Sequence, residues 1–539
     1  MYKSGYFYDW VPKWAALLLL MIFQFAFLAV SGIYTTNISY MAAESGSQAD
    51  YFMWGYYANA VGMGIAMPLM VRVRNRFRVK EIVSGVFILL AAFSYIIGTT
   101  TQPYVIVLCS LAIGFFKMFG SMQMLIVLMF IVSPDGNRGK FYSIFYPYVL
   151  CAIWLTYVVI TEITYRLNWQ IAYMYVAAFC LVMSMLAVIF MHNHRSIRKV
   201  PLYYIDWLSA ILFAVCFMSL AYVFAFGKSQ DWFSSDRMKL AFGVFVMSTV
   251  LMSVRQVTLK RPYLSFRIFE KSNVRHGLLM LFFTGMFLGL GTLQTVFCVG
   301  VLGYDYHITA EIYLLSLPGI VFGGYVGYYW FRQMMPIKFY ILLGFASYTL
   351  YCVYMYFGMV RDFSFSMWVI PMFLRGFGMC ILFISIWYYT LDKLNPTDML
   401  AAIGLIIVWR SFVSIGLFTA FFSWLQYLLQ WQSISNLAVY MDANNLPSRD
   451  ALAGLRTTQI NAVLGATKEI FGYVIIAGIG VMLYVYFHHF GRIRFTILRF
   501  RRSYIGKQLI NKRRRKEEVQ RLERKALEEE MGDSAGAIL

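Results

Sequence analysis

Charged residues are scarce in this sequence. Only 13% of its 539 residues are Asp, Glu, Lys or Arg, whereas 60% are hydrophobic, and the mean hydropathy is +0.65. A soluble domain carries about 25% charged residues, so this chain cannot cover its own surface with groups that favour water. The composition excludes an ordinary soluble protein and predicts one whose surroundings are mostly lipid.

The motifs of common enzymes and metal sites are missing as well. The sequence contains no Walker P-loop, no G-x-S-x-G and no H-E-x-x-H. None of the seven cysteines belongs to a C-x-x-C pair, and all lie in apolar runs. We therefore expect them to be small buried hydrophobes, without disulfides, metal sites or other cofactors. The six histidines lie at the edges of the apolar runs, so the sequence predicts no enzyme.

Acidic residues are outnumbered, with 25 Asp and Glu against 46 Lys and Arg. In a soluble protein a net charge of +21 would suggest a nucleic-acid partner. Here the basic residues lie in short connections between apolar runs. They indicate membrane topology instead, and we expect no nucleic-acid binding.

Long apolar runs dominate the rest of the chain. A helix needs about 20 apolar residues to cross a bilayer, and continuous runs favour helices over the alternating strands of a barrel. The sequence predicts fourteen transmembrane helices, near residues 13–33, 51–71, 82–100, 104–132, 141–163, 168–191, 205–227, 238–258, 276–300, 308–330, 337–358, 366–390, 400–428 and 467–488.

The basic connections all follow even-numbered spans. They include Arg72 to Lys80, Arg195 to Lys199, Arg255 to Arg275, and the segment after residue 490. Because short cytoplasmic loops are rich in Lys and Arg, we expect a multi-pass inner-membrane protein with both termini in the cytoplasm. The first run follows an aromatic N-terminus without a small-residue cleavage site, so it is expected to be a retained span.

Two segments lie outside the predicted spans. Residues 429–466 form a long external connection, read either as a surface loop with short interfacial helices or as a docking surface for a partner across the periplasm. Residues 491–539 form a basic cytoplasmic tail, with bases interleaved among apolar residues, as in a helix lying on anionic headgroups.

Three cations are predicted near the middle of the bilayer, where an ionisable group is costly and often functional. They are Lys117, Arg375 and Arg410, in the fourth, twelfth and thirteenth spans. Each either faces a substrate cavity or pairs with helix carbonyls and polar neighbours to fix the packing. Of the few acidic residues, Glu162 is the best candidate for proton coupling, although it could be an ordinary interfacial residue beside Arg166.

Uncharged polar groups complete the candidate substrate site. Gln24, Gln123 and Gln294 lie in spans one, four and nine, and Trp154 and Trp387 are candidate aromatic walls. A few polar groups in an aromatic cavity are typical of a small-molecule site. Most of the other aromatic residues are explained by packing and by interfacial belts.

Several motifs in order along the chain resemble the major facilitator superfamily, specifically its fourteen-span drug:proton antiporter branch. Leu374-Arg375-Gly376-Phe377-Gly378 matches the R-G-x-G of the twelfth span, and Asn168-Trp169-Gln170 is similar to W-R-W at the head of the sixth. Lys260-Arg261-Pro262 and the residues to Phe269 are similar to P-L-x-D-L-R-L-F before the ninth span. The resemblance covers about residues 13–488.

The chain departs from that branch where the branch couples to protons. In the gating loop, G-x-L-x-D-R-x-G, the acid position is Asn75, and Arg76 is the retained base. The acid position of the first span is Gly32, and the arginine of the fourth span is replaced by the neighbouring Lys117. The resemblance therefore carries over the fold better than the proton-coupling apparatus.

The resemblance implies an all-α polytopic fold with two six-helix bundles and two extra linker helices. The expected units are an N-terminal bundle at 1–200, linker helices at 201–274, a C-terminal bundle at 275–490 and a tail at 491–539. It also implies a secondary active transporter that exports hydrophobic or amphipathic small molecules by proton coupling, with a periplasmic adaptor and an outer-membrane channel as candidate partners. A facilitator or flippase without proton coupling, and a non-transporting scaffold or sensor, are the alternatives.

Overall fold

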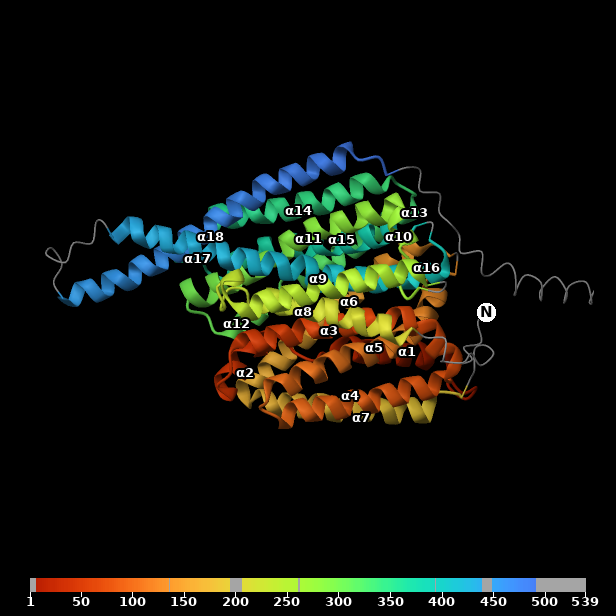
Figure 1. Ribbon diagram of the computed structural model, residues 1–539. Helices are drawn as coiled ribbons and strands as arrows, with labels where there is room; N and C mark the ends of the chain where they lie inside the picture. The colour runs from red at the N-terminus through yellow and green to blue at the C-terminus, as the bar shows by residue number, and fades with distance from the viewer. Residues whose placement is uncertain are drawn as a thin grey trace, which may run out of the picture.

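The computed structural model describes residues 6–490 except 135, 194–205, 260–261, 393 and 439–447. The described chain is helical, apart from one isolated β-bridge between Phe7 and Met191. Figure 1 shows the long helices lying side by side in one bundle. Its α-helices are α1 (Lys13–Ala29), α2 (Ile38–Ser45), α3 (Ala49–Arg76), α4 (Val79–Thr99), α5 (Pro103–Val132), α6 (Arg138–Arg166), α7 (Trp169–Phe190), α8 (Trp207–Phe226), α9 (Asp236–Thr258), α10 (Arg267–Glu270), α11 (Ser272–Val296), α12 (Tyr306–Leu314), α13 (Leu317–Arg332), α14 (Ile337–Gly358), α15 (Val369–Thr390), α16 (Pro396–Val408), α17 (Ile415–Ala438) and α18 (Ser448–Phe487).

Twelve helical segments of the described chain are long and apolar enough to cross a membrane. Two of the fourteen predicted spans fall outside this set. Helix α1 has only 17 residues because the chain leaves the helix at Val30. Helix α3 is long, but its middle is only weakly apolar because it contains Trp54, Tyr56, Tyr57 and Asn59. The multi-pass membrane protein is confirmed, and the count of fourteen stays a prediction.

Local signals fix the starts of several helices. Asn137 accepts hydrogen bonds from the backbone N–H groups of Gly139 and Lys140 at the start of α6. Asn168 accepts one from Ile171 at the start of α7. Asparagine and aspartate are preferred at this position because their oxygens satisfy N–H groups that the helix itself leaves free.

The helices form two groups in contact with each other. In the first group α3 packs on α5 and α4 on both α5 and α7; in the second, α13 and α14 pack on α15, and α18 on α14 and α17. Helix α6 joins the groups by packing on α12, α13 and α15, and α3 joins them by packing on α16. The expected division into N- and C-terminal bundles and linker helices stays a prediction.

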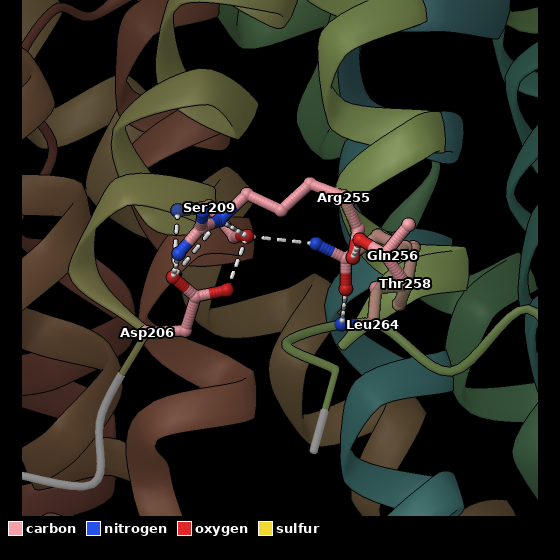
Figure 2. A network of polar contacts seen from close by, with 6 residues as sticks. All are labelled: Asp206, Ser209, Arg255, Gln256, Thr258 and Leu264. Carbon is pink, nitrogen blue, oxygen red and sulfur yellow. Dashed lines mark hydrogen bonds and ion pairs between the residues drawn. The ribbon is translucent and has the colours of Figure 1, made fainter. Parts of the chain in front are cut away.

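Helices α8 and α9 form a hairpin that packs on α3. Figure 2 shows the polar network at one end of the hairpin. Arg255 of α9 donates to the Asp206 carboxylate, with Nη2 2.8 Å from Oδ1, and Gln256 Nε2 donates to Ser209 Oγ over 2.8 Å. The backbone N–H of Leu264 then donates to Gln256 Oε1 over 2.9 Å. The network ties both helices and the following loop into one unit.

A neighbouring residue of that loop fastens the unit to the first group. The Tyr263 hydroxyl donates to the carbonyl of Ile65, in α3, over 2.6 Å. Partial burial of the Asp206 carboxyl would raise its pKa, but hydrogen bonds from Arg255 and Ser209 outweigh burial and hold the pKa below its ordinary value. Asp206 is therefore ionised at neutral pH and the network is charged.

The segment 429–466 differs from the expected loop with short helices. Helix α17 continues to Ala438 and α18 begins at Ser448, and the residues between them, 439–447, lie outside the part of the chain that the structure describes. The two helices extend closer to the Asn444-Asn445-Leu446-Pro447 stretch than expected, because helix-forming residues precede and follow it. In Figure 1 the ends of α17 and α18 project beyond the other helices. The predicted tail, 491–539, lies outside the described residues.

Candidate functional site

Arg375 and Gln294, two predicted site residues, meet inside the second group. The Arg375 Nη1 donates to Gln294 Oε1, which also accepts from the Tyr351 hydroxyl over 3.2 Å. The guanidinium lies over the Tyr313 ring, 5.1 Å from its centroid, and within 6.0 Å of the Tyr351 centroid. Cation–π contacts and an amide oxygen thus hold a buried charge that has no carboxylate partner among the described residues.

Tyr313 connects this arginine to the first group. Its ring stacks on Trp154 of α6, with centroids 4.7 Å apart and planes 12° from parallel. Tyr157, also of α6, meets the same ring edge-on, and its hydroxyl contacts Thr35. Trp154 was predicted as a wall of the site. Tyr313 was not, because nothing in the sequence distinguishes it among 40 tyrosines.

Arg410 lies in a second cluster between the groups. It belongs to η5 (Trp409–Ser414), a π-helical turn between α16 and α17, and such turns are frequent at functional sites. Its guanidinium lies 4.8 Å from the Phe383 centroid, and Nη2 donates to Ser411 Oγ over 3.3 Å. Trp387, one turn along α15 from Phe383, packs against Tyr146 of α6 at 5.9 Å between ring centroids.

Several side chains of these clusters are only partly buried. Arg410, Tyr56 and Tyr157 each retain an intermediate exposure. The two clusters therefore have the character expected of a site for a small molecule: aromatic walls with a few polar groups.

Lys117 has a different environment. Its ammonium donates to the carbonyl oxygen of Val30 over 3.0 Å, at the end of α1. Residues 30–34 are not helical, and Tyr173 donates to the freed carbonyl of Gly32 while Tyr34 donates to that of Ala29, both over 2.9 Å. Inside a membrane such carbonyls must find donors within the protein. The geometry fits the alternative in which Lys117 pairs with helix carbonyls.

The two predicted glutamines of the first group are not part of the two clusters. Gln24 donates to Ser121 Oγ over 3.0 Å, which joins α1 to α5. Gln123 is fully buried, and both polar atoms of its amide lack a described partner. No described contact brings either glutamine to Arg375 or Arg410, so their role in substrate binding stays a prediction.

The predicted proton-coupling and gating residues lie at the ends of helices. Glu162 forms an ion pair with Arg166 one turn along α6; Arg166 is exposed and Glu162 is partly exposed. Asn75 and Arg76 lie in the last turn of α3, where Arg76 is exposed. None of Lys117, Arg375 and Arg410 forms an ion pair with any residue that the structure describes.

The two groups of helices are in contact on both sides of these clusters. At the end of the bundle that holds Arg138, Asn137 Nδ2 donates to the Phe331 carbonyl over 3.5 Å, and Arg138 Nη1 to the Leu391 carbonyl over 3.3 Å. At the opposite end Tyr165 of α6 stacks on His307 of α12, with centroids 4.3 Å apart. Helix α6 therefore contacts the second group along most of its length.

Within the described residues no cluster of three His, Cys, Asp or Glu side chains could hold a metal ion. All seven cysteines lie in the described helices and are free, and six of them are buried. Their small size fits packing roles in the helix bundle.

Comparison with known proteins decides the family. The family model described as Major Facilitator Superfamily matches residues 19–419, most of the membrane region. The chain belongs to the Major Facilitator Superfamily. It is thus a membrane transporter and not an enzyme, as the sequence predicted.

Individual relatives are distant from this superfamily member. A 102-residue segment is 34% identical to the "Uncharacterized MFS-type transporter YcnB" of Bacillus subtilis (strain 168), covering 19% of this chain and about a fifth (21%) of that relative. A point mutant of the nucleoside transporter NupG is similar in structure at 12% identity, with a TM-score of 0.54 over 87% of this chain and 99% of its own. A second structure of NupG gives a TM-score of 0.52. These likenesses support the all-helical major facilitator fold.

Proposed function

We propose that this transporter exports small hydrophobic or amphipathic compounds. The observation that carries the proposal is the stack of Trp154 on Tyr313, with Arg375 against the same tyrosine. It offers a wide aromatic surface with one polar group, and each half of the transporter contributes one ring. Such a surface suits ligands that have a large apolar body and few hydrogen-bonding groups.

Relative movement of the two groups would give access to this site. Major facilitator carriers rock two halves about a central substrate site. Here α6 contacts α12 beyond the stack and α13 on the other side of it. Opening either contact would expose the clusters to one side of the membrane, which is what alternating access requires.

In the preferred form of the proposal, export is coupled to protons and Glu162 carries the proton. A facilitator or flippase without coupling is the second candidate, and one observation favours it. Glu162 is paired with Arg166 and only partly exposed, and the position of the branch's first-span acid is Gly32. A proton carrier must be reachable from both sides, and a carboxylate that is paired with an arginine near the end of a helix does not satisfy that requirement.

The cellular setting belongs to the same proposal. The basic connections support a chain in the inner membrane with both termini in the cytoplasm. The ends of α17 and α18 would then project into the periplasm, where a periplasmic adaptor leading to an outer-membrane channel could dock.

Export is tested in cells that lack their main efflux pumps. Cells expressing the chain are loaded with a panel of fluorescent amphipathic dyes, and dye loss is followed over time. We expect faster loss than in empty-vector cells, and expect Trp154→Ala to abolish the difference. Trp14→Ala is the matched control, since Trp14 is 72% exposed in α1, away from the interface. Equal dye loss with and without the chain for the whole panel would contradict export.

Coupling is tested in inside-out membrane vesicles. Substrate accumulation that collapses when nigericin dissipates the pH gradient supports an antiporter. Accumulation or equilibration that does not respond to nigericin supports the facilitator.

A further inference from the structure

The membrane core of this transporter holds positive charge without described negative charge to balance it. Lys117, Arg375 and Arg410 all lie within the helices, and none forms an ion pair with a described residue. An uncompensated charge in this position is expensive and is retained where it has a partner. For Lys117 that partner is the Val30 carbonyl, and for Arg375 it is Gln294 with two tyrosine rings.

Arg410 is the least satisfied of the three. A guanidinium has five N–H donors, and that of Arg410 makes one described hydrogen bond, to Ser411 Oγ. Its other contact is the Phe383 ring, which accepts no strong hydrogen bond. Four donors therefore remain for a partner that the described residues do not supply, and the side chain is partly accessible.

Near Arg410 lies a second hydrogen-bond donor without a described acceptor, the indole N–H of Trp387. The Trp387 Nε1 is buried and has no described hydrogen-bond partner, and the residue is 6% exposed. Trp387 lies on the same face of α15 as Phe383, four residues away, so it is a neighbour of the Arg410 contact. Tyr146 packs against both rings from α6, and Tyr56 of α3 lies close enough to Arg410 to interact with it electrostatically. The cluster thus has donors from one group of helices and aromatic walls from both.

We propose that Arg410 and Trp387 bind the acidic group of an amphipathic organic anion, whose apolar body lies against Tyr56, Tyr146 and Phe383. A carboxylate or sulfonate offers the oxygens that both donors lack, and arginine binds such groups with two parallel hydrogen bonds. Arg375 lies eight residues from Phe383 on α15, about 12 Å along the helix, and adds to the positive potential. The same charges repel a cationic ligand. This inference rests on the proposed export function and names its substrate class.

The test measures binding to the purified full-length transporter in detergent. The probes are 1-pyrenebutyrate, its neutral amide and 4-(1-pyrenyl)butylamine, which share one apolar body and differ in the charge of the head group. We expect the anion to bind at least about tenfold more tightly than the amide, and the amine to bind most weakly. Equal affinities for the three probes would overturn the proposal.

Variants assign the preference to the two donors. Arg410→Gln is expected to remove the preference for the anion and to weaken amide binding by a much smaller factor, whereas Arg410→Lys keeps part of the preference. Trp387→Phe keeps an aromatic ring and deletes the donor, so it should weaken anion binding by a smaller factor. Arg332→Gln, an exposed arginine at the end of α13, is the control for loss of one charge. If Arg410→Gln elutes as aggregate, Arg410→Lys and Trp387→Phe still decide the question. An unchanged anion preference in both would overturn the site.

The result is separable from that of the export assay. Export of neutral or cationic dyes without an anion preference would leave the proposed function standing and remove this inference. Arg410-dependent anion binding without export of any dye would support the anion site and contradict the proposed export function. Excess chloride is added as a competitor, and complete loss of pyrenebutyrate binding at physiological chloride would show an inorganic anion site instead, which also contradicts the proposal.

Discussion

Lys117 donates a hydrogen bond to the carbonyl oxygen of Val30 over 3.0 Å, where α1 ends inside the bundle. The contact links α5 to the non-helical segment 30–34. It gives a buried ammonium a structural partner, and it satisfies a carbonyl that the helix has released.

Lys117→Met should therefore lower stability before it affects substrate affinity. Leaving a buried carbonyl without its donor costs about 1–3 kcal/mol. We expect a lower thermal midpoint for the purified variant, measured by the loss of monodisperse protein on heating, with partial recovery in Lys117→Arg. Lys239→Met is the control, because Lys239 is exposed in an ion pair with Asp236. A normal midpoint combined with loss of transport would assign Lys117 to the substrate instead.

Arg375→Lys should keep the charge and weaken substrate binding. A lysine ammonium cannot lie flat over Tyr313 and also reach Gln294 as the guanidinium does. Cation–π contacts of this kind are worth about 0.5–2 kcal/mol, so we expect the apparent KM of transport to rise by roughly a few-fold to thirtyfold at unchanged expression. Tyr351→Phe, which removes one hydroxyl and keeps the ring, should have a smaller effect. Wild-type kinetics in Arg375→Lys would show that only the charge matters.

Linking Tyr165 to His307 should stop transport. These residues stack across the interface between α6 and α12, and alternating access requires that contact to open. In a background without native cysteines, Tyr165→Cys with His307→Cys should be inactivated by a short reducible bis-thiosulfonate and reactivated by reductant. Tyr175→Cys with His307→Cys is the control, since Tyr175 is exposed on α7. Full activity after complete cross-linking would mean that α6 and α12 do not separate.

Asp206→Asn should destabilise the α8–α9 hairpin in a pH-dependent way. Burial raises the pKa of the folded carboxyl, but the hydrogen bonds from Arg255 and Ser209 outweigh it and leave the pKa below its ordinary value. The contribution of Asp206 is therefore present above the ordinary carboxyl pKa, about 4, and is lost as pH falls through the folded value. We expect the thermal midpoint of the variant to lie below that of the wild type at pH 7, with the gap closing below about pH 4. A gap that is constant with pH would show that the charge of Asp206 is irrelevant.

Protonation of His488 should lower the stability of the protein, starting at a higher pH than the effect of Asp206. Burial, together with the nearby positive charges of His276, His489 and Lys338, lowers its pKa. Its ring lies 4.2 Å from that of His276, and its Nε2 contacts the Tyr389 hydroxyl over 3.1 Å. Folding then favours the neutral ring, so stability should be full above the ordinary histidine pKa and fall as pH drops below it. His488→Gln should flatten the decrease between about pH 7 and pH 5, measured from thermal midpoints. An equally steep decrease in the variant would place its origin elsewhere.

Much of the helix pattern could be predicted from the sequence, because hydrocarbon demands long apolar runs and allows few charges. The same rule identified Arg375 and Arg410 as unusual. It could not show that Tyr313 joins Arg375 to Trp154, since a stacking partner has no signature along the chain. It also could not separate Lys117 from the two arginines. The structural role of Lys117 depends on where α1 ends, at Val30. The sequence does not mark this end with a proline or with two consecutive glycines.

The connection at 429–466 was the main difference in architecture. Hydropathy reports where the lipid ends, and helices do not have to end there. The stretches before residue 439 and after residue 447 are polar enough to leave the membrane and still favour helix. A hydropathy pattern therefore indicates where the membrane ends and sets no limit for the helix.

Helix α18 is 40 residues long, about 60 Å, which is twice the roughly 30 Å of a bilayer core. Together with α17 it is a lever anchored in the second group of helices. A small tilt of that group during transport becomes a larger sweep at the far end of the hairpin, well outside the lipid. A partner bound there would be displaced in each transport cycle, and a partner that held the hairpin fixed would slow transport.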